Sequence, residues 1–214
     1  MTARRETSIA TSDVVSMFPT FVWKIALKRE VCDRIGRTLL EAVSSMRSDR
    51  PELAPGESWQ SDNDLQRRAE LGELCSGIEE AATAVLRFLS VSPAGLDITG
   101  CWVNVNAPGA AHRLHTHPNN FLSGVYYVRT HEGANVIYFH DPRPQTGIIR
   151  PGVTELTAAN TDQVVVPVSD GSLLLFPAWL PHSVPPNESD ENRISVSFNL
   201  MFSDYTNSMS APLW

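Results

Sequence analysis

The feature that most constrains the fold of this sequence is a change of period near residue 95. Beyond Gly100, apolar and polar residues tend to alternate, as they do on a strand with one buried face. Pro, Gly and Asn separate the alternating runs, a pattern typical of the short strands of a sandwich or barrel. The predicted strands are residues 101–106, 122–128, 135–140, 164–168, 172–176 and 193–202.

Before this change, the spacing of the apolar residues is helical. Residues 31–46 and 71–89 each place apolar side chains on one face of a helix, and Pro93 follows the second segment. Residues 21–27 are typical of a strand, whereas residues 48–64 are rich in Pro, Gly, Ser and Asp and are predicted to form a loop. The amino-terminal part therefore supplies one strand and two helices.

We expect residues 1–214 to form a single domain. Residues 1–95 would pack on a barrel core of residues 96–205, and residues 206–214 would form a tail. The net charge of −7 argues against a nucleic-acid or membrane partner. The chain has no apolar run near the ~18 residues of a membrane span, no secretory leader, and too few cysteines for a disulfide framework. These features predict a cytoplasmic protein.

Two of the predicted strands carry a polar face. The residues of these faces are Trp102, Asn104 and Asn106 on one strand and Arg193, Ser195, Ser197 and Asn199 on the other. Such a face commonly points to solvent in antiparallel sheets, but in a small barrel it can line an interior that holds a ligand. A tryptophan beside two asparagines is unusual for a solvent face and favours the interior.

Three histidines have a spacing that a barrel could bring to one metal ion. His115 and His117 are two residues apart, so on a strand their side chains point to the same side. His182 follows an apolar strand, and a barrel mouth brings strand ends together. Three imidazoles would form a facial set with open coordination positions. The first two histidines alone could equally be residues at the edge of a loop, and it is the third that favours a metal site.

Five motifs occur in order along the second half of the chain. They are His115-Thr-His117-Pro118, Ser123-Gly-Val-Tyr-Tyr127, Asp141-Pro-Arg143, Phe176-Pro-Ala-Trp-Leu-Pro-His182 and Arg193-Ile-Ser-Val-Ser-Phe-Asn199. With these motifs the chain resembles the small bacterial 2-oxoglutarate/Fe(II)-dependent oxygenases of the cupin-like double-stranded β-helix superfamily. It departs from the general cupin pattern because it lacks the glutamate after the histidine pair and has Trp179 where glycine is usual.

The resemblance implies both a fold and a reaction. The fold is mainly β, a double-stranded β-helix (jelly-roll) with two buttressing helices. The cofactor is Fe(II), with 2-oxoglutarate and O2 as cosubstrates. The reaction oxidises an unactivated C–H of a small molecule, an amino acid or a natural-product intermediate and gives succinate and CO2. The outcome is hydroxylation or a related cyclisation or desaturation.

The resemblance also implies iron ligands. His115 and His182 would bind Fe(II) together with a third ligand from the strand of the first motif. The superfamily usually has a carboxylate there, and this sequence has His117. We favour His117 because of its spacing from His115. Asp141 is the rival, although an Asp before a proline is more often the cap of a turn.

For 2-oxoglutarate, the resemblance points to Arg193. A guanidinium offers two parallel N–H donors to a carboxylate and is always charged. Ser195, Tyr127 and Asn104 would contribute further contacts to the cosubstrate. The alternative is a surface arginine that pairs with Asp190 or Glu191.

The remaining candidates concern the substrate. Asn106, Trp102, Phe121 and Trp179 are predicted to bind or line it, although the three aromatic residues could equally be ordinary core. His112 would lie in a flexible loop or behind the site, and either His140 or Asp141 would face inward. The long segment of residues 142–162 is a candidate lid.

Two other functions stay open at this point. A 2-oxoglutarate-independent three-histidine cupin dioxygenase could use the same metal site, and so could a non-catalytic cupin that binds a metal or a ligand. Dependence on 2-oxoglutarate discriminates between them. The expected partner is a small-molecule or carrier-tethered substrate, with no nucleic acid and no membrane. A homodimer is compatible with exposed strand edges.

Overall fold

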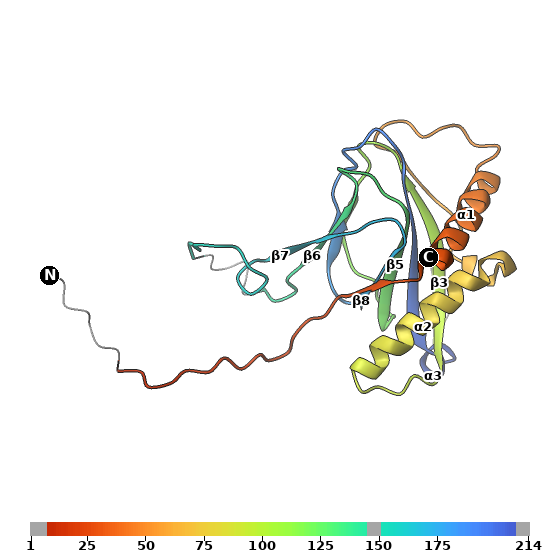
Figure 1. Cartoon of the computed structure of the whole chain (residues 1–214). Coiled ribbons are helices and arrows are strands. Elements are labelled where there is room, and N and C mark those ends of the chain that lie inside the picture. The colour runs from red at the N-terminus through yellow and green to blue at the C-terminus, as the bar shows by residue number, and fades with distance from the viewer. Residues whose placement is uncertain (1–7, 145–150, 209–214) are drawn as a thin grey trace.

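Two antiparallel sheets face each other, and helices cover the outer side of the larger one (Figure 1). This computed structural model describes residues 8–144 and 151–208. The larger sheet consists, in spatial order, of β1 (Trp23–Ala26), β8 (Ser172–Pro177), β5 (Leu122–Arg129), β10 (Arg193–Phe202), β3 (Leu96–Asn106) and β2 (Ser58–Gln60). The smaller sheet consists of β4 (His112–His115), β9 (His182–Val184), β6 (Val136–His140) and β7 (Gln163–Pro167).

The two long helices lie where the apolar spacing predicts them, whereas three short helical segments were not predicted. They are α1 (Arg29–Met46), α2 (Gly72–Phe88), the short α3 (Ser203–Thr206) and two 3-10 turns, η1 (Leu65–Arg67) and η2 (Ala69–Leu71). None of the helices in the described part of the chain combines the length and the apolar character that a membrane crossing requires. The predicted strand before the first helix is confirmed as β1, which pairs with β8.

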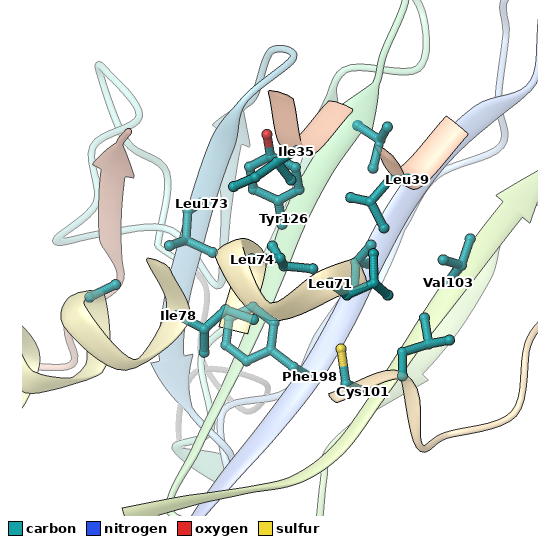
Figure 2. Packing of buried hydrophobic residues seen from close by; sticks show 14 of the residues in the cluster. Ile35, Leu39, Leu71, Leu74, Ile78, Cys101, Val103, Tyr126, Leu173 and Phe198 are labelled. Atoms are coloured by element: carbon teal, nitrogen blue, oxygen red, sulfur yellow. The ribbon is translucent and has the colours of Figure 1, made fainter. Parts of the chain in front are cut away.

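The main core lies between α1, α2 and the outer face of the six-stranded sheet. The alternating apolar residues of β3 and β10 point to this side, so the opposite, polar faces of both strands point to the smaller sheet. Burial of each large side chain here contributes roughly 1.5–3 kcal/mol. Figure 2 shows Ile35 and Leu39 of α1, Leu74 and Ile78 of α2, and Val103, Tyr126, Leu173 and Phe198 of the sheet.

A second core fills part of the space between the two sheets. Leu174 and Phe176 of the larger sheet meet Ile137, Phe139 and Val184 of the smaller one. The rings of Phe139 and Phe176 have centroids 5.0 Å apart in an edge-to-face arrangement. This second core leaves the rest of the space between the sheets for polar side chains.

Three strands were not predicted from a period of two, although the resemblance implied a strand at the first motif. β2 lies within the predicted loop, and β4 and β9 lie in segments with no period of two. These strands have three or four residues, too few for a repeat to show, and their pairing partners define them. β3 begins at Leu96 rather than at residue 101.

The candidate lid and the predicted tail are described in part. Of residues 142–162, residues 145–150 lie outside the described residues, and residues 151–160 are exposed. The predicted tail of residues 206–214 is described as far as residue 208, and the rest lies outside the described residues.

Gly124 of β5 occupies a position that only glycine fits. A Cβ at this position would lie 2.2 Å from Cζ of Phe198 and 2.6 Å from the carbonyl oxygen of Leu174. We therefore expect Gly124→Ala to lower the free energy of unfolding by about 1–3 kcal/mol, because neither neighbour can retreat without disturbing the main core. Urea denaturation of both proteins measures the difference.

The matched control is Gly36→Ala in α1, where a Cβ would meet nothing within 4 Å. Alanine favours a helix interior over glycine by up to about 1 kcal/mol, so this variant should be as stable as the parent or more stable. Equal stabilities of the two variants would contradict the close approach at Gly124.

Candidate active site

A cavity of about 250 Å³ lies between the two sheets. The smaller sheet and the segment after β4 contribute histidines to its wall, and the larger sheet contributes a cluster of polar residues around Arg193. The polar faces of β3 and β10 therefore point into the interior rather than to solvent, as the alternation and Trp102 predicted. The two sheets thus bring different chemistry to one cavity.

Three histidines form a group that can hold a metal ion. One ring nitrogen from each of His115, His117 and His182 lies within 4.8 Å of the others. His115 is paired directly opposite His182 across β4 and β9. His117 lies beyond the end of β4, so strand alternation does not orient it. Its backbone N–H donates instead to the carbonyl oxygen of Ala178 at 2.9 Å, which ties it to the segment that leads to β9.

Hydrogen bonds to backbone carbonyls orient two of the imidazoles. Nδ1 of His115 lies 2.7 Å from the carbonyl oxygen of Arg113, and Nδ1 of His182 lies 2.9 Å from that of Leu180. In both contacts Nδ1–H must donate, so the proton is on Nδ1 and the Nε2 lone pair is free for a metal.

Burial keeps two of these imidazoles neutral, those of His117 and His182. It is the main cause that lowers the pKa of His182 to about 3, and the neighbouring histidines are a smaller cause. It also lowers the pKa of His117 to about 4, with His115 as the second cause. The ring of Phe176, 4.7 Å from that of His182, contributes to the burial. Neutral imidazoles are the form that binds metals, so these two ligands need lose no proton near neutral pH.

Asp141 lies outside the metal-binding group. Its carboxylate accepts hydrogen bonds from the backbone N–H of Arg143 at 2.9 Å and from the Arg143 guanidinium. These bonds hold the pKa of Asp141 below its usual value. Asp141 is thus the turn cap that its position before Pro142 suggested. His140 points to the outer face of β6, where its Nε2 lies 2.8 Å from Oγ of Ser183.

Arg193 is a buried cation without a counterion. Its side chain lines the cavity and is 3% exposed, so the alternative of a surface arginine is wrong. Among the described residues no carboxylate lies within 4.0 Å of it, and its buried Nε has no hydrogen-bond partner. Burial lowers the pKa of the guanidinium. A buried charge is costly unless it is paired, so this cation favours an anionic ligand.

The other three residues predicted to bind the cosubstrate line the same cavity. Ser195 pairs across the sheet with Asn104 on one side and with Tyr127 on the other. Burial raises the pKa of Tyr127 to about 12, so its phenol is a neutral donor. Nδ2 of Asn104 donates to Oγ of Ser197 at 3.0 Å, which leaves the amide oxygen as an acceptor.

The four residues predicted to bind or line the substrate have different locations. Trp102 lines the cavity, with its ring centroid 6.0 Å from that of His117. Asn106 is fully buried behind Arg193 and bonded to it. Phe121 and Trp179 do not line the cavity, contrary to the prediction. Phe121 packs against the main core and against Phe202, and Trp179 is 55% exposed.

Two residues that line the cavity were expected in loops. His112, expected in a flexible loop, begins β4 and lines the cavity. Gln60 of β2 lines it as well and was within the predicted loop. Burial, with Arg193 and His115 as further causes, lowers the pKa of His112 to about 4. The clustering of histidines in the sequence was a signal for His112, whereas no local signal marks Gln60.

Comparison with known proteins finds one matching family model and several structures with a similar fold. A family model described as "Putative 2OG-Fe(II) oxygenase" matches residues 100–199. The fold is similar to that of SnoN, an α-ketoglutarate-dependent epimerase from nogalamycin biosynthesis, with 15% identity over 86% of this chain and 79% of that one and a TM-score of 0.60. It is also similar to AviO1 from Streptomyces viridochromogenes Tue57, with 14% identity over 90% and 92% of the two chains and a TM-score of 0.60.

A third similar structure is a prolyl-4-hydroxylase from Pseudomonas putida, with 16% identity over 86% of this chain and 93% of that one and a TM-score of 0.57. No match was found among curated proteins. The likeness confirms the double-stranded β-helix fold. The matched residues include the three histidines and Arg193, and the match supports an oxidoreductase that uses Fe(II), 2-oxoglutarate and O2.

Proposed function

We propose that His115, His117 and His182 hold the iron and that Arg193 binds the distal carboxylate of 2-oxoglutarate. The observation that carries this proposal is the buried Arg193, which has no counterion among the described residues and shares one cavity with three imidazoles. Three imidazole nitrogens leave open positions on an iron ion, as a chelating cosubstrate requires. Two proteins of similar fold bind such ligands: SnoN in complex with Fe3+ and α-ketoglutarate, and HygX with nickel and 2-oxoglutarate.

The donors around Arg193 suit a dicarboxylate that reaches from one sheet to the other. Arg193 and Ser195 of β10 and Tyr127 of β5 offer N–H and O–H donors at one wall. The histidines stand at the opposite wall. When bound, iron and 2-oxoglutarate together supply oxidative chemistry with release of succinate and CO2. The chain itself orients the cosubstrate, and Phe139 and Phe176 exclude water behind His182.

We further propose a small-molecule substrate, such as an amino acid or a natural-product intermediate, free or tethered to a carrier. The cavity of about 250 Å³ is near the lower end of the range for small-molecule sites, ~300–1,000 Å³. SnoN and SnoK, named as an epimerase and a carbocyclase from nogalamycin biosynthesis, support chemistry beyond hydroxylation. We also propose a cytoplasmic location, which suits the free thiols of Cys32, Cys75 and Cys101.

A homodimer is part of the same proposal. Residues 8–22 extend away from the two sheets (Figure 1), and Val14 and Phe18 on this segment are 98% and 93% exposed. Val164 and Val165 are also exposed on β7, which is an edge strand. Exposed apolar side chains at a free edge favour association between copies. Sedimentation velocity at two protein concentrations measures the state.

The function is tested by anaerobic titration of the Fe(II)-loaded protein with 2-oxoglutarate. We expect a weak visible charge-transfer band that grows and saturates, because a bidentate 2-oxo acid on Fe(II) absorbs there. Succinate would fill the Arg193 site without chelating iron and is the matched control, with no band expected. Stoichiometric iron without a band for 2-oxoglutarate would overturn the proposal in favour of a 2-oxoglutarate-independent dioxygenase.

A further inference from the structure

Asn106 stands at the end of β3 with every polar group of its side chain in use. It is 0% exposed. Its Nδ2 donates to Oγ of Ser58 at 2.8 Å and lies 2.8 Å from Nε2 of His112. Its Oδ1 accepts a hydrogen bond from Nη2 of Arg193 at 3.3 Å. Its backbone oxygen is also occupied, by Nδ2 of Asn187.

These partners fix the direction of the amide. Flipping it would turn the NH2 group toward the guanidinium, which can only donate, and two donors would face each other. The contact with the Asn106 amide therefore requires Nε2 of His112 to accept, with the His112 proton on Nδ1. Ser58, Asn106 and His112, which we call the clasp, thus present one neutral acceptor to Arg193.

A neutral acceptor has a specific consequence for a buried cation. It restricts the guanidinium to one orientation and leaves its charge uncompensated. A carboxylate at the same position would orient Arg193 as well, but it would also neutralise the charge that an anionic ligand requires. The nearest candidates for such a carboxylate, Asp190 and Glu191, form no ion pair with Arg193.

We propose that Asn106 is a positioning residue, which through the clasp aims Arg193 at the carboxylate of the cosubstrate while keeping its full charge available. This inference rests on the proposed function. It replaces the expectation that Asn106 contacts the substrate, because Asn106 stands behind Arg193 and does not line the cavity.

The test is the nearly isosteric change Asn106→Asp. The new carboxylate would pair with Arg193 inside the protein and compete with 2-oxoglutarate for it. Ser58 and His112 can both turn donors toward it. We expect the Kd of 2-oxoglutarate to rise roughly 10- to 100-fold, which is less than for the loss of Arg193 itself. Iron content should stay at the parent level, and the apparent KM for 2-oxoglutarate should change much more than kcat.

Two further variants separate positioning from general damage. Asn192→Asp adds the same charge at an exposed neighbour of Arg193 and should leave the Kd unchanged. Asn106→Ala removes the clasp but keeps the charge of Arg193 free. Its Kd for 2-oxoglutarate should therefore lie between those of the parent and Asn106→Asp. Calorimetry on the anaerobic Fe(II)-loaded proteins gives each Kd without turnover.

The outcomes separate this inference from the proposed function. If the parent itself does not bind 2-oxoglutarate, both fail. If the parent binds it and Asn106→Asp binds it equally well, the clasp is overturned and the proposed function stands. Loss of iron together with 2-oxoglutarate would also overturn the clasp, because it would mean that Asn106 supports the whole cavity. If Asn106→Asp does not fold, Asn106→Ala decides, and parental affinity in that variant counts against the proposal.

Discussion

His182→Ala is expected to abolish iron binding and turnover. His182 is 3% exposed, lies opposite His115 in the strand pairing, and is one of three imidazoles that can reach one ion. The variant would keep two protein ligands. Loss of a residue that merely supports a metal ligand costs about 10–100-fold in affinity, and loss of the ligand itself should cost more. Iron is measured per chain after anaerobic loading and desalting.

His140→Ala is the control for this experiment. His140 lies one residue beyond Phe139, which pairs with His182, but its side chain bonds Ser183 on the outer face. It should keep one iron per chain. Stoichiometric iron in His182→Ala would remove His182 from the ligand set. The melting temperature of His182→Ala is needed beside the iron content, because the side chain also fills space beside Phe176.

Arg193→Met is expected to abolish 2-oxoglutarate binding and to leave iron in place. Loss of one partner of a buried, hydrogen-bonded charge pair costs about 2–5 kcal/mol, which corresponds to roughly 1.5 to 3.5 orders of magnitude in Kd. The metal ligands come from the smaller sheet and the segment after β4, so iron content should not change. Anaerobic calorimetry and iron analysis measure the two quantities on the same sample.

Arg193→Met is also expected to leave the ligand-free protein at least as stable as the parent. Even the replacement of a buried ion pair with apolar side chains of similar volume is often neutral or stabilising by about 1–4 kcal/mol, and a buried charge without a counterion contributes less stability than a paired one. Ligand-free Arg193→Met should therefore melt at or above the temperature of the parent. Arg193→Lys keeps the charge without the planar fork and should bind 2-oxoglutarate with intermediate affinity. A lower melting temperature for Arg193→Met would mean that the hydrogen bond from Arg193 to Asn106 stabilises the protein by more than the buried charge costs.

The long strands and helices could be predicted because their periods are long enough to show. β10 has the predicted bounds, and polar and apolar residues alternate without a break over its first eight residues, 193–200. The same alternation assigned Arg193 and Ser195 to the interior, although solvent was an equally regular reading of the pattern. Trp102 decided between them, because a large aromatic side chain is a poor residue for a solvent face.

The short strands could not be predicted, and they determine much of the site. β4 and β9 exist because they pair with each other, and that pairing brings His115 to His182 and His112 into the cavity. The motif resemblance identified His115 and His182 without this pairing, but it carried no information on His112. Gln60 depends in the same way on the pairing of β2 with β3.

Phe121 and Trp179 show a further limit of sequence analysis. Both lie close to motif residues, and an aromatic side chain near a predicted site suggests that it lines the substrate cavity. The backbone N–H of Phe121 donates to the carbonyl oxygen of Leu200, just before β5, and the ring packs on the side of the helices. The direction of such a ring depends on partners far away in the sequence, which a local pattern does not contain.

The division of the site between two sheets has a consequence for how enzymes of this shape can diverge. The wall that carries Arg193 is also the wall on which α1 and α2 pack, so substitutions there disturb folding and cosubstrate binding together. The wall that carries His115 and His182 belongs to a smaller sheet whose edge strand exposes valines. Apart from its metal ligands, that wall can accumulate changes at little cost to the main core. Substitutions that change the substrate preference should therefore arise first in the smaller sheet, while the binding of 2-oxoglutarate by the larger sheet stays unchanged.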